Sequence, residues 1–173
     1  MDKHADQTRE CSMDAHGVPA RRTRETGSSV TMDRVAVTTQ TRESESANAK
    51  ILIVDDDEGV TQTFARMLRL EGYQVRTAVS AETGLREARD SRPDAIILDL
   101  RMPLVDGLGF LRQLRARDEQ RRTPVAIVTG DYFLDDAVST ELRELGAELR
   151  FKPLWLEDLV GLARNLLQSR VIH

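Results

Sequence analysis

The strongest constraint on the fold is a repeated alternation, from residue 50 onward, between short apolar runs and segments with helical spacing of apolar side chains. Three of the runs are continuous and rich in β-branched residues, which is typical of parallel strands buried on both faces of a sheet. The other two runs are more polar, which suits strands at the edges of such a sheet. We expect the five strands at 51–54, 73–78, 95–98, 125–128 and 147–151.

A helical segment follows each of these runs, and Gly72 and Gly146 directly follow two of the segments as helix stops. The helices are expected at 58–71, 81–90, 107–117, 134–145 and 156–169. Five successive strand–helix units with right-handed crossovers predict an α/β fold. Its simplest form is a doubly wound, five-stranded parallel sheet of strand order 2-1-3-4-5, a flavodoxin-like arrangement.

Composition excludes several classes of protein. The 173 residues carry a net charge of −4, which gives no electrostatic case for nucleic acid as a direct partner. No apolar stretch is long enough to span a membrane, and the charged N-terminus lacks the apolar core of a signal peptide, so the cytoplasm is the expected location. The single cysteine, Cys11, cannot form an internal disulfide or a cysteine-based metal cluster.

Residues 1–49 differ from the rest, because they are rich in Thr, Ser and charged residues and almost lack Leu, Ile and Phe. Such a segment buries too little apolar surface to offset the entropy of ordering it. We therefore predict two parts, a disordered N-terminal extension at 1–49 and one folded domain at 50–173.

Unusual polar residues stand where four of the expected strands end. The first strand ends in Asp55-Asp56-Asp57, the third in Asp99, the fourth in Thr129-Gly130 and the fifth in Lys152-Pro153. An acid after a strand is often only a helix cap or a turn former. In a parallel sheet, however, all of these ends meet at one edge, where ligands of such folds bind.

The chemistry of that edge matches phosphoryl transfer. Carboxylates brought close together repel one another unless a cation holds them, and a site of oxygen ligands favours Mg²⁺ over zinc. An aspartate can itself act as the nucleophile and form an aspartyl phosphate, and Asp99 is the candidate. Lys152 would supply a cation and Thr129 a hydroxyl group for the phosphoryl oxygens.

Four motifs also resemble the receiver domain of response regulators in bacterial two-component systems: "ILIVDDDEGV", "AIILDLRMPLVDG", "VAIVTG" and "FKPL". The match covers about residues 50 to 170 in the right order and spacing. It implies that Asp99 accepts a phosphoryl group from a histidine kinase or phosphotransfer protein. It further implies that Asp55 and Asp56 hold Mg²⁺ together with Asp99, and that Arg101 lends a backbone carbonyl to the metal.

By the same resemblance, Thr129 is the hydroxyl that responds to phosphorylation and Lys152 is the cation that contacts the phosphoryl group. The Lys152-Pro153 bond is often cis in the family. The sequence departs from the family at Leu149, where an aromatic residue or histidine commonly acts as a rotameric switch. Phe151 lies one residue before Lys152 instead, so the usual coupling between threonine and aromatic ring is in doubt.

Two variable positions flank the expected site: Arg101 is two residues after Asp99, and Asp131 is two residues after Thr129. A pair between them across the phosphoryl group would tune the lifetime of the aspartyl phosphate.

Because the chain ends directly after its last expected helix, the sequence suggests a stand-alone receiver without a DNA-binding output domain. It would act as a signalling protein, not as an enzyme, by changing how it binds an unknown downstream protein. By the same resemblance, the chain could instead form a homodimer through the face of residues 134–170.

Two other interpretations stay open at this point. Asp55 and Asp57 have the spacing of the acids in phosphatases of the haloacid dehalogenase type, although Gly59 departs from that motif and no cap insertion is present. Turnover of p-nitrophenyl phosphate would favour such an enzyme. The chain could also be an interaction module that works without phosphorylation, which the intact acids, Thr129 and Lys152 argue against.

Overall fold

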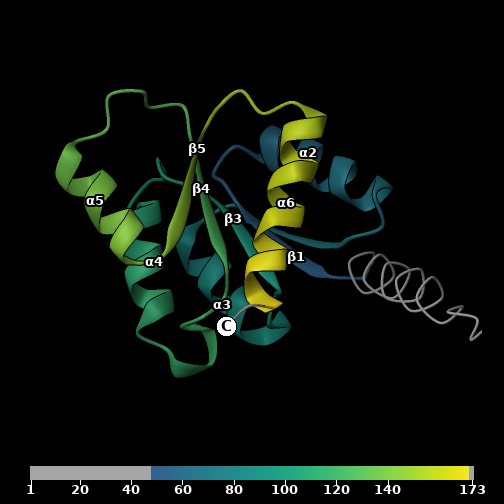
Figure 1. Ribbon diagram of the computed structural model, residues 1–173, viewed down its shortest axis with the longest axis horizontal. Helices are drawn as coiled ribbons and strands as arrows, with labels where there is room; N and C mark the ends of the chain where they lie inside the picture. The colour runs from purple at the N-terminus through teal and green to yellow at the C-terminus, as the bar shows by residue number, and fades with distance from the viewer. Residues whose placement is uncertain (1–47, 172–173) are drawn as a thin grey trace, which may run out of the picture.

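In the computed structural model, which describes residues 48–171, a five-stranded parallel sheet is covered by helices on both faces (Figure 1). The strand order is β2-β1-β3-β4-β5, and every neighbouring pair is parallel. This confirms the expected fold class and strand order. The strands are β1 (Lys50–Val54), β2 (Gln74–Ala78), β3 (Ala95–Asp99), β4 (Val125–Thr129) and β5 (Ala147–Phe151). The N-terminal extension predicted at 1–49 lies almost entirely outside the described residues.

Five α-helices follow the strands within the described part of the chain, and a short 3-10 helix (Asp118–Gln120) precedes β4. Figure 1 shows α2 and α6 on one side of the sheet and α3, α4 and α5 on the other. None of the helices within 48–171 is long and apolar enough to cross a membrane. The helices are α2 (Glu58–Leu70), α3 (Ala81–Ser91), α4 (Gly107–Arg115), α5 (Asp136–Glu144) and α6 (Leu156–Val171).

The burial of the strands follows their composition. Every residue of β3 and β4 is buried, and so are the last four residues of β1, because these three strands lie inside the sheet with helices on both faces. The edge strands β2 and β5 alternate or are only partly buried. Two apolar cores result, one under α2 and α6 and the other under α3, α4 and α5.

Local capping explains where individual helices begin and end. The carboxylate of Asp135 accepts a hydrogen bond from the N–H of Ala137 at 2.7 Å, so α5 begins at Asp136 and not at 134 as the periodicity predicts. Helix α4 ends at Arg115, two residues earlier than expected. Gly72 and Gly146 have φ angles of 91° and 71°, the left-handed conformation that ends α2 and α5 as predicted.

Candidate functional site

The parallel sheet brings four distant stretches of chain to one edge, the upper edge of the sheet in Figure 1. Asp55 directly follows β1, Asp99 is the last residue of β3, Thr129 is the last of β4, and Lys152 directly follows β5. β1 and β4 flank β3 on its two sides, so Asp99 lies between the other two strand ends. The convergence expected from the sequence is therefore confirmed.

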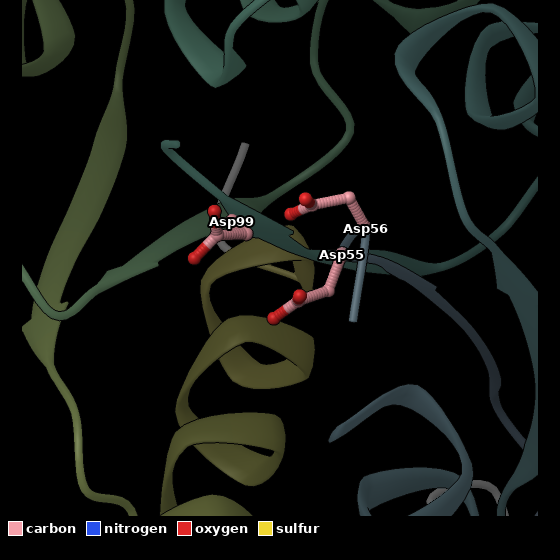
Figure 2. Close-up of side chains that lie close together, drawn as sticks. All are labelled: Asp55, Asp56 and Asp99. Carbon is pink, nitrogen blue, oxygen red and sulfur yellow. The ribbon is translucent and has the colours of Figure 1, made fainter. Parts of the chain in front are cut away.

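Asp55, Asp56 and Asp99 form an acidic cluster in which one carboxylate oxygen of each residue lies within 4.8 Å of the others. Figure 2 shows the three side chains close together at the ends of their strands. Asp55 and Asp99 are buried, whereas Asp56 is exposed. A compact set of carboxylate oxygens is the donor set of Mg²⁺ and other hard divalent cations, so these residues fit a metal of that kind.

Lys152 joins the two buried acids. Its Nζ atom lies 2.7 Å from Oδ2 of Asp55 and 2.7 Å from Oδ1 of Asp99. Burial alone would lower the pKa of Lys152, but the hydrogen bonds to the two carboxylates outweigh it and raise the pKa above its ordinary value. The lysine therefore stays charged and balances part of the negative charge of the cluster.

The pKa of Asp99 is set by opposing effects of burial and hydrogen bonding. Burial raises the pKa of its carboxyl group above the ordinary value, although Lys152 and the backbone N–H of Arg101 both donate hydrogen bonds that lower it. That the Arg101 carbonyl binds a metal stays a prediction.

Asp57 is not part of the acidic cluster. Its backbone N–H donates to Oδ1 of Asp55 at 2.9 Å, which helps to orient that carboxylate. Its own Oδ1 accepts the N–H of Val60 at 3.1 Å and caps α2. The Asp55–Asp57 spacing of a dehalogenase-type phosphatase therefore does not place both carboxylates in one site.

Thr129 is fully buried at the end of β4. In the sheet register Asp99 lies beside Val128, so Thr129 is one residue beyond the neighbour of Asp99. The Thr129 hydroxyl accepts the N–H of Asp131 at 3.1 Å, and its carbonyl accepts the N–H of Lys152 at 2.8 Å. The threonine thus links the loop after β4 to the lysine of the site.

Arg101 and Asp131 form the ion pair that their positions suggested. The Arg101 guanidinium donates through both Nε, at 3.1 Å, and Nη2 to the same carboxylate oxygen of Asp131. This contact holds the pKa of Asp131 below its usual range. It joins the loop after β3 to the loop after β4 beside the acidic cluster.

Some features of the site were missed from the sequence. The Tyr132 ring stacks on Phe151, and its hydroxyl donates to the Lys152 carbonyl. Gly107 packs directly against the backbone at Asp99. An aromatic residue in the loop directly after Thr129 was the available signal for the first contact, and the glycine directly after the loop acid Asp106 was the signal for the second.

Comparisons with known proteins agree with this geometry. The family model described as the response regulator receiver domain matches residues 51–162. The chain is 40% identical over 122 residues to the transcriptional regulatory protein PrrA of Mycobacterium tuberculosis, covering 70% of this chain and 51% of PrrA. It is 36% identical over 124 residues to the response regulator MprA of Mycobacterium ulcerans, covering 70% of this chain and 51% of MprA.

A solved structure shows the same fold. The chemotaxis protein CheY4 of Vibrio cholerae superimposes with a TM-score of 0.65 at 30% identity, over 69% of this chain and 99% of that protein.

One expectation is wrong. The chain spans about half the length of the curated relatives it matches, and one of these is named a transcriptional regulatory protein. The end of the chain therefore does not support a stand-alone receiver without a DNA-binding output domain. The error came from treating the last residue of the sequence as the boundary of the protein.

The fold, the acidic cluster with its bridging lysine and the match over residues 51–162 lead to one assignment. The chain belongs to the response regulator receiver domain family.

Proposed function

We propose that this domain is the phosphoacceptor of a two-component system or phosphorelay, and that Asp99 takes its phosphoryl group from a phosphohistidine on a histidine kinase or phosphotransfer protein. The observation that carries the proposal is the placement of Lys152 Nζ 2.7 Å from both Asp99 and Asp55, inside a carboxylate cluster that fits a divalent cation. The site thus combines a nucleophile, a metal-binding set and a fixed cation.

The proposed transfer is a nucleophilic displacement at the phosphorus atom. A carboxylate oxygen of Asp99 forms the new P–O bond while the P–N bond of the phosphohistidine breaks, and the imidazole nitrogen leaves with the bonding electrons. Lys152 already donates to Oδ1 of Asp99, so its ammonium group is close to the phosphoryl oxygens that the reaction brings in. Their negative charge is stabilised by this preorganised donor.

We assign Asp55, Asp56 and Asp99 as the residues that hold Mg²⁺. When bound there, Mg²⁺ would neutralise charge on the phosphoryl oxygens that Lys152 does not reach. Asp55 is oriented for this task by the Asp57 N–H, and Asp56 is exposed, so a partner's phosphoryl group can enter from solvent on its side.

Thr129 is the proposed link between phosphorylation and partner binding. Its hydroxyl oxygen accepts the Asp131 N–H, which leaves the hydroxyl proton available to a phosphoryl oxygen. The proposed partner surface is the face of residues 134–170, where Trp155 and Leu156 are exposed while Leu159 and Val160 are buried. A downstream protein or a second copy of the chain would bind there, in the cytoplasm, and the domain would not act as an enzyme on small phosphate esters.

The first test is the intact mass of the full chain after incubation with acetyl phosphate and Mg²⁺. We expect a gain of one phosphoryl group in the wild type and none in Asp99→Asn, because the amide cannot act as the nucleophile. A chelator added before the donor should also abolish the gain.

Asp57→Asn is the matched control, because Asp57 is outside the cluster, and it should still gain the phosphoryl group. Phosphorylation that persists in Asp99→Asn would contradict the proposal. Sustained turnover of p-nitrophenyl phosphate by the wild type would favour the phosphatase alternative instead.

A second test concerns the ion pair between Arg101 and Asp131. Because it joins the two loops beside the acidic cluster, opening it should admit water and shorten the half-life of the aspartyl phosphate severalfold. Arg101→Ala, Asp131→Ala and the double variant should all shorten it to the same degree, since each removes the same contact. Glu141→Ala, which breaks an ion pair between α4 and α5, is the control. Unchanged half-lives in both single variants would refute a role for the pair.

A further inference from the structure

Two aromatic rings meet on the surface beside the site. Tyr132, in the loop between β4 and α5, stacks on Phe151 at the end of β5, with ring centroids 5.3 Å apart and ring planes 13° from parallel. The rings remain 61% and 41% exposed, respectively, so they do not belong to either apolar core. The Tyr132 hydroxyl donates a hydrogen bond to the backbone carbonyl of Lys152.

The main chain of Lys152 is thereby held at both of its polar groups by one short segment. Its N–H donates to the Thr129 carbonyl at 2.8 Å, and its carbonyl accepts from Tyr132, three residues later in the same loop. The sheet register also pairs Thr129 with Phe151, the residue on which Tyr132 stacks. The end of β5 and the loop after β4 are therefore tied together directly behind the Lys152 side chain.

Two hydrogen bonds shape the turn that follows Thr129 and contains Tyr132. The N–H of Asp131 donates to the Thr129 hydroxyl at 3.1 Å, and the N–H of Phe133 donates to the Asp131 carboxylate at 3.0 Å. A displacement of the Thr129 hydroxyl would act on this turn through the hydrogen bond to the Asp131 N–H. Because Tyr132 is part of the turn, the displacement reaches the backbone of Lys152.

Position 149 does not offer such a link. Leu149 is partly buried against the core on the α4 and α5 side of the sheet, and it has neither a ring nor a hydroxyl group. Tyr132 has both a ring and a hydroxyl group, and it lies in the loop after β4, the strand next to β5.

We propose that Tyr132 is the positioning residue for Lys152: its hydroxyl and its stack on Phe151 hold the end of β5 so that the lysine ammonium group stays between Asp55 and Asp99. Through the same contacts it couples Thr129 to Lys152. The coupling to phosphorylation rests on the proposed function, but the positioning of Lys152 does not need a phosphoryl donor.

The positioning can be measured through Mg²⁺ binding by the full chain in the absence of any donor. Lys152 occupies carboxylate oxygens that the cation would use, so a loosened lysine competes less well with Mg²⁺. In calorimetry, Tyr132→Phe, which loses the hydroxyl but keeps the ring stack, should tighten Mg²⁺ binding by about two- to tenfold, the equivalent of one neutral hydrogen bond. Tyr132→Leu, which loses the ring stack as well, should produce a larger change in the same direction.

The decisive measurement repeats Tyr132→Leu in a Lys152→Met background. If Tyr132 acts through Lys152, Tyr132→Leu has no effect once Lys152 has been replaced by methionine. The Mg²⁺ affinities of Lys152→Met and of the double variant then coincide. Phe133→Leu is the control, because the neighbouring Phe133 ring is 95% exposed. Thermal unfolding checks that each variant is folded. If Tyr132→Leu does not fold, the Mg²⁺ affinity of Tyr132→Phe tests the proposal instead.

The proposal is overturned if Tyr132→Leu and Tyr132→Phe leave Mg²⁺ affinity unchanged, or if Tyr132→Leu changes it equally with and without Lys152. A wild type that binds Mg²⁺ but accepts no phosphoryl group would refute the proposed function while leaving this test intact. A wild type that binds no Mg²⁺ would contradict both.

Discussion

Replacing Lys152 with methionine is expected to slow phosphoryl transfer from acetyl phosphate to Asp99 by about 100-fold or more, the usual effect of removing one preorganised donor from a transition state. Lys152 is the only cation that contacts both buried acids among the described residues, with Nζ 2.7 Å from each. Methionine keeps an unbranched side chain of similar volume, so the change isolates the charge and its hydrogen bonds.

The same substitution should tighten Mg²⁺ binding, because the ammonium group no longer neutralises the carboxylates that would hold the metal. Opposite effects on transfer rate and metal affinity distinguish a lost catalytic group from a damaged fold, which would weaken both. Both quantities come from intact-mass time courses and calorimetry. Lys50→Met, at the start of β1 and thus the far end of the sheet, is the control. An unchanged transfer rate in Lys152→Met would contradict the assigned role.

Gly107→Ala should destabilise the fold by about 1–3 kcal/mol or more, as overpacking of a filled interior does. A Cβ atom on Gly107 would lie 2.5 Å from the Asp99 carbonyl oxygen and 2.9 Å from the Leu100 Cα. Both are backbone atoms, so no side-chain rotation relieves the contact. α4 must move away from the end of β3, which displaces the residue that carries the nucleophile. We therefore expect slower phosphoryl transfer as well as a lower free energy of unfolding.

Gly161→Ala in α6 is the matched control, because nothing lies within 4 Å of its added Cβ atom. There the usual preference for alanine in a helix should stabilise the fold by about 0.5–1 kcal/mol. Denaturant unfolding measures both variants. Equal stability of Gly107→Ala and the wild type would show that the close packing behind Asp99 is not needed.

Most of the fold was predictable, because the pattern of buried strands is explicit in the chain. The runs at 95–98 and 125–128 are apolar throughout and became the two strands whose residues are all buried. Once parallel pairing is assumed, geometry alone places Asp55, Asp99 and Lys152 at a common edge. Helix boundaries were less accurate, since the beginning of α5 depends on a cap that periodicity does not reveal.

Contacts between loops were not predictable in the same way. The stack of Tyr132 on Phe151 joins a side chain of the loop after β4 to one at the end of β5, and no spacing rule within one segment specifies it. The lysine bridge depends on the direction of a long side chain, which sequence position does not determine. The absence of an output domain was a mistaken inference, because the last residue of a sequence carries no physical information about any domain beyond it.

The most direct test of the central claim is to locate the phosphoryl group chemically. After incubation with acetyl phosphate and Mg²⁺, borohydride reduces an aspartyl phosphate to homoserine, which peptide mass spectrometry can place in the chain. The account predicts homoserine at Asp99, and none when Mg²⁺ is chelated. Homoserine at Asp55 or Asp56 instead, or at no aspartate, would contradict it.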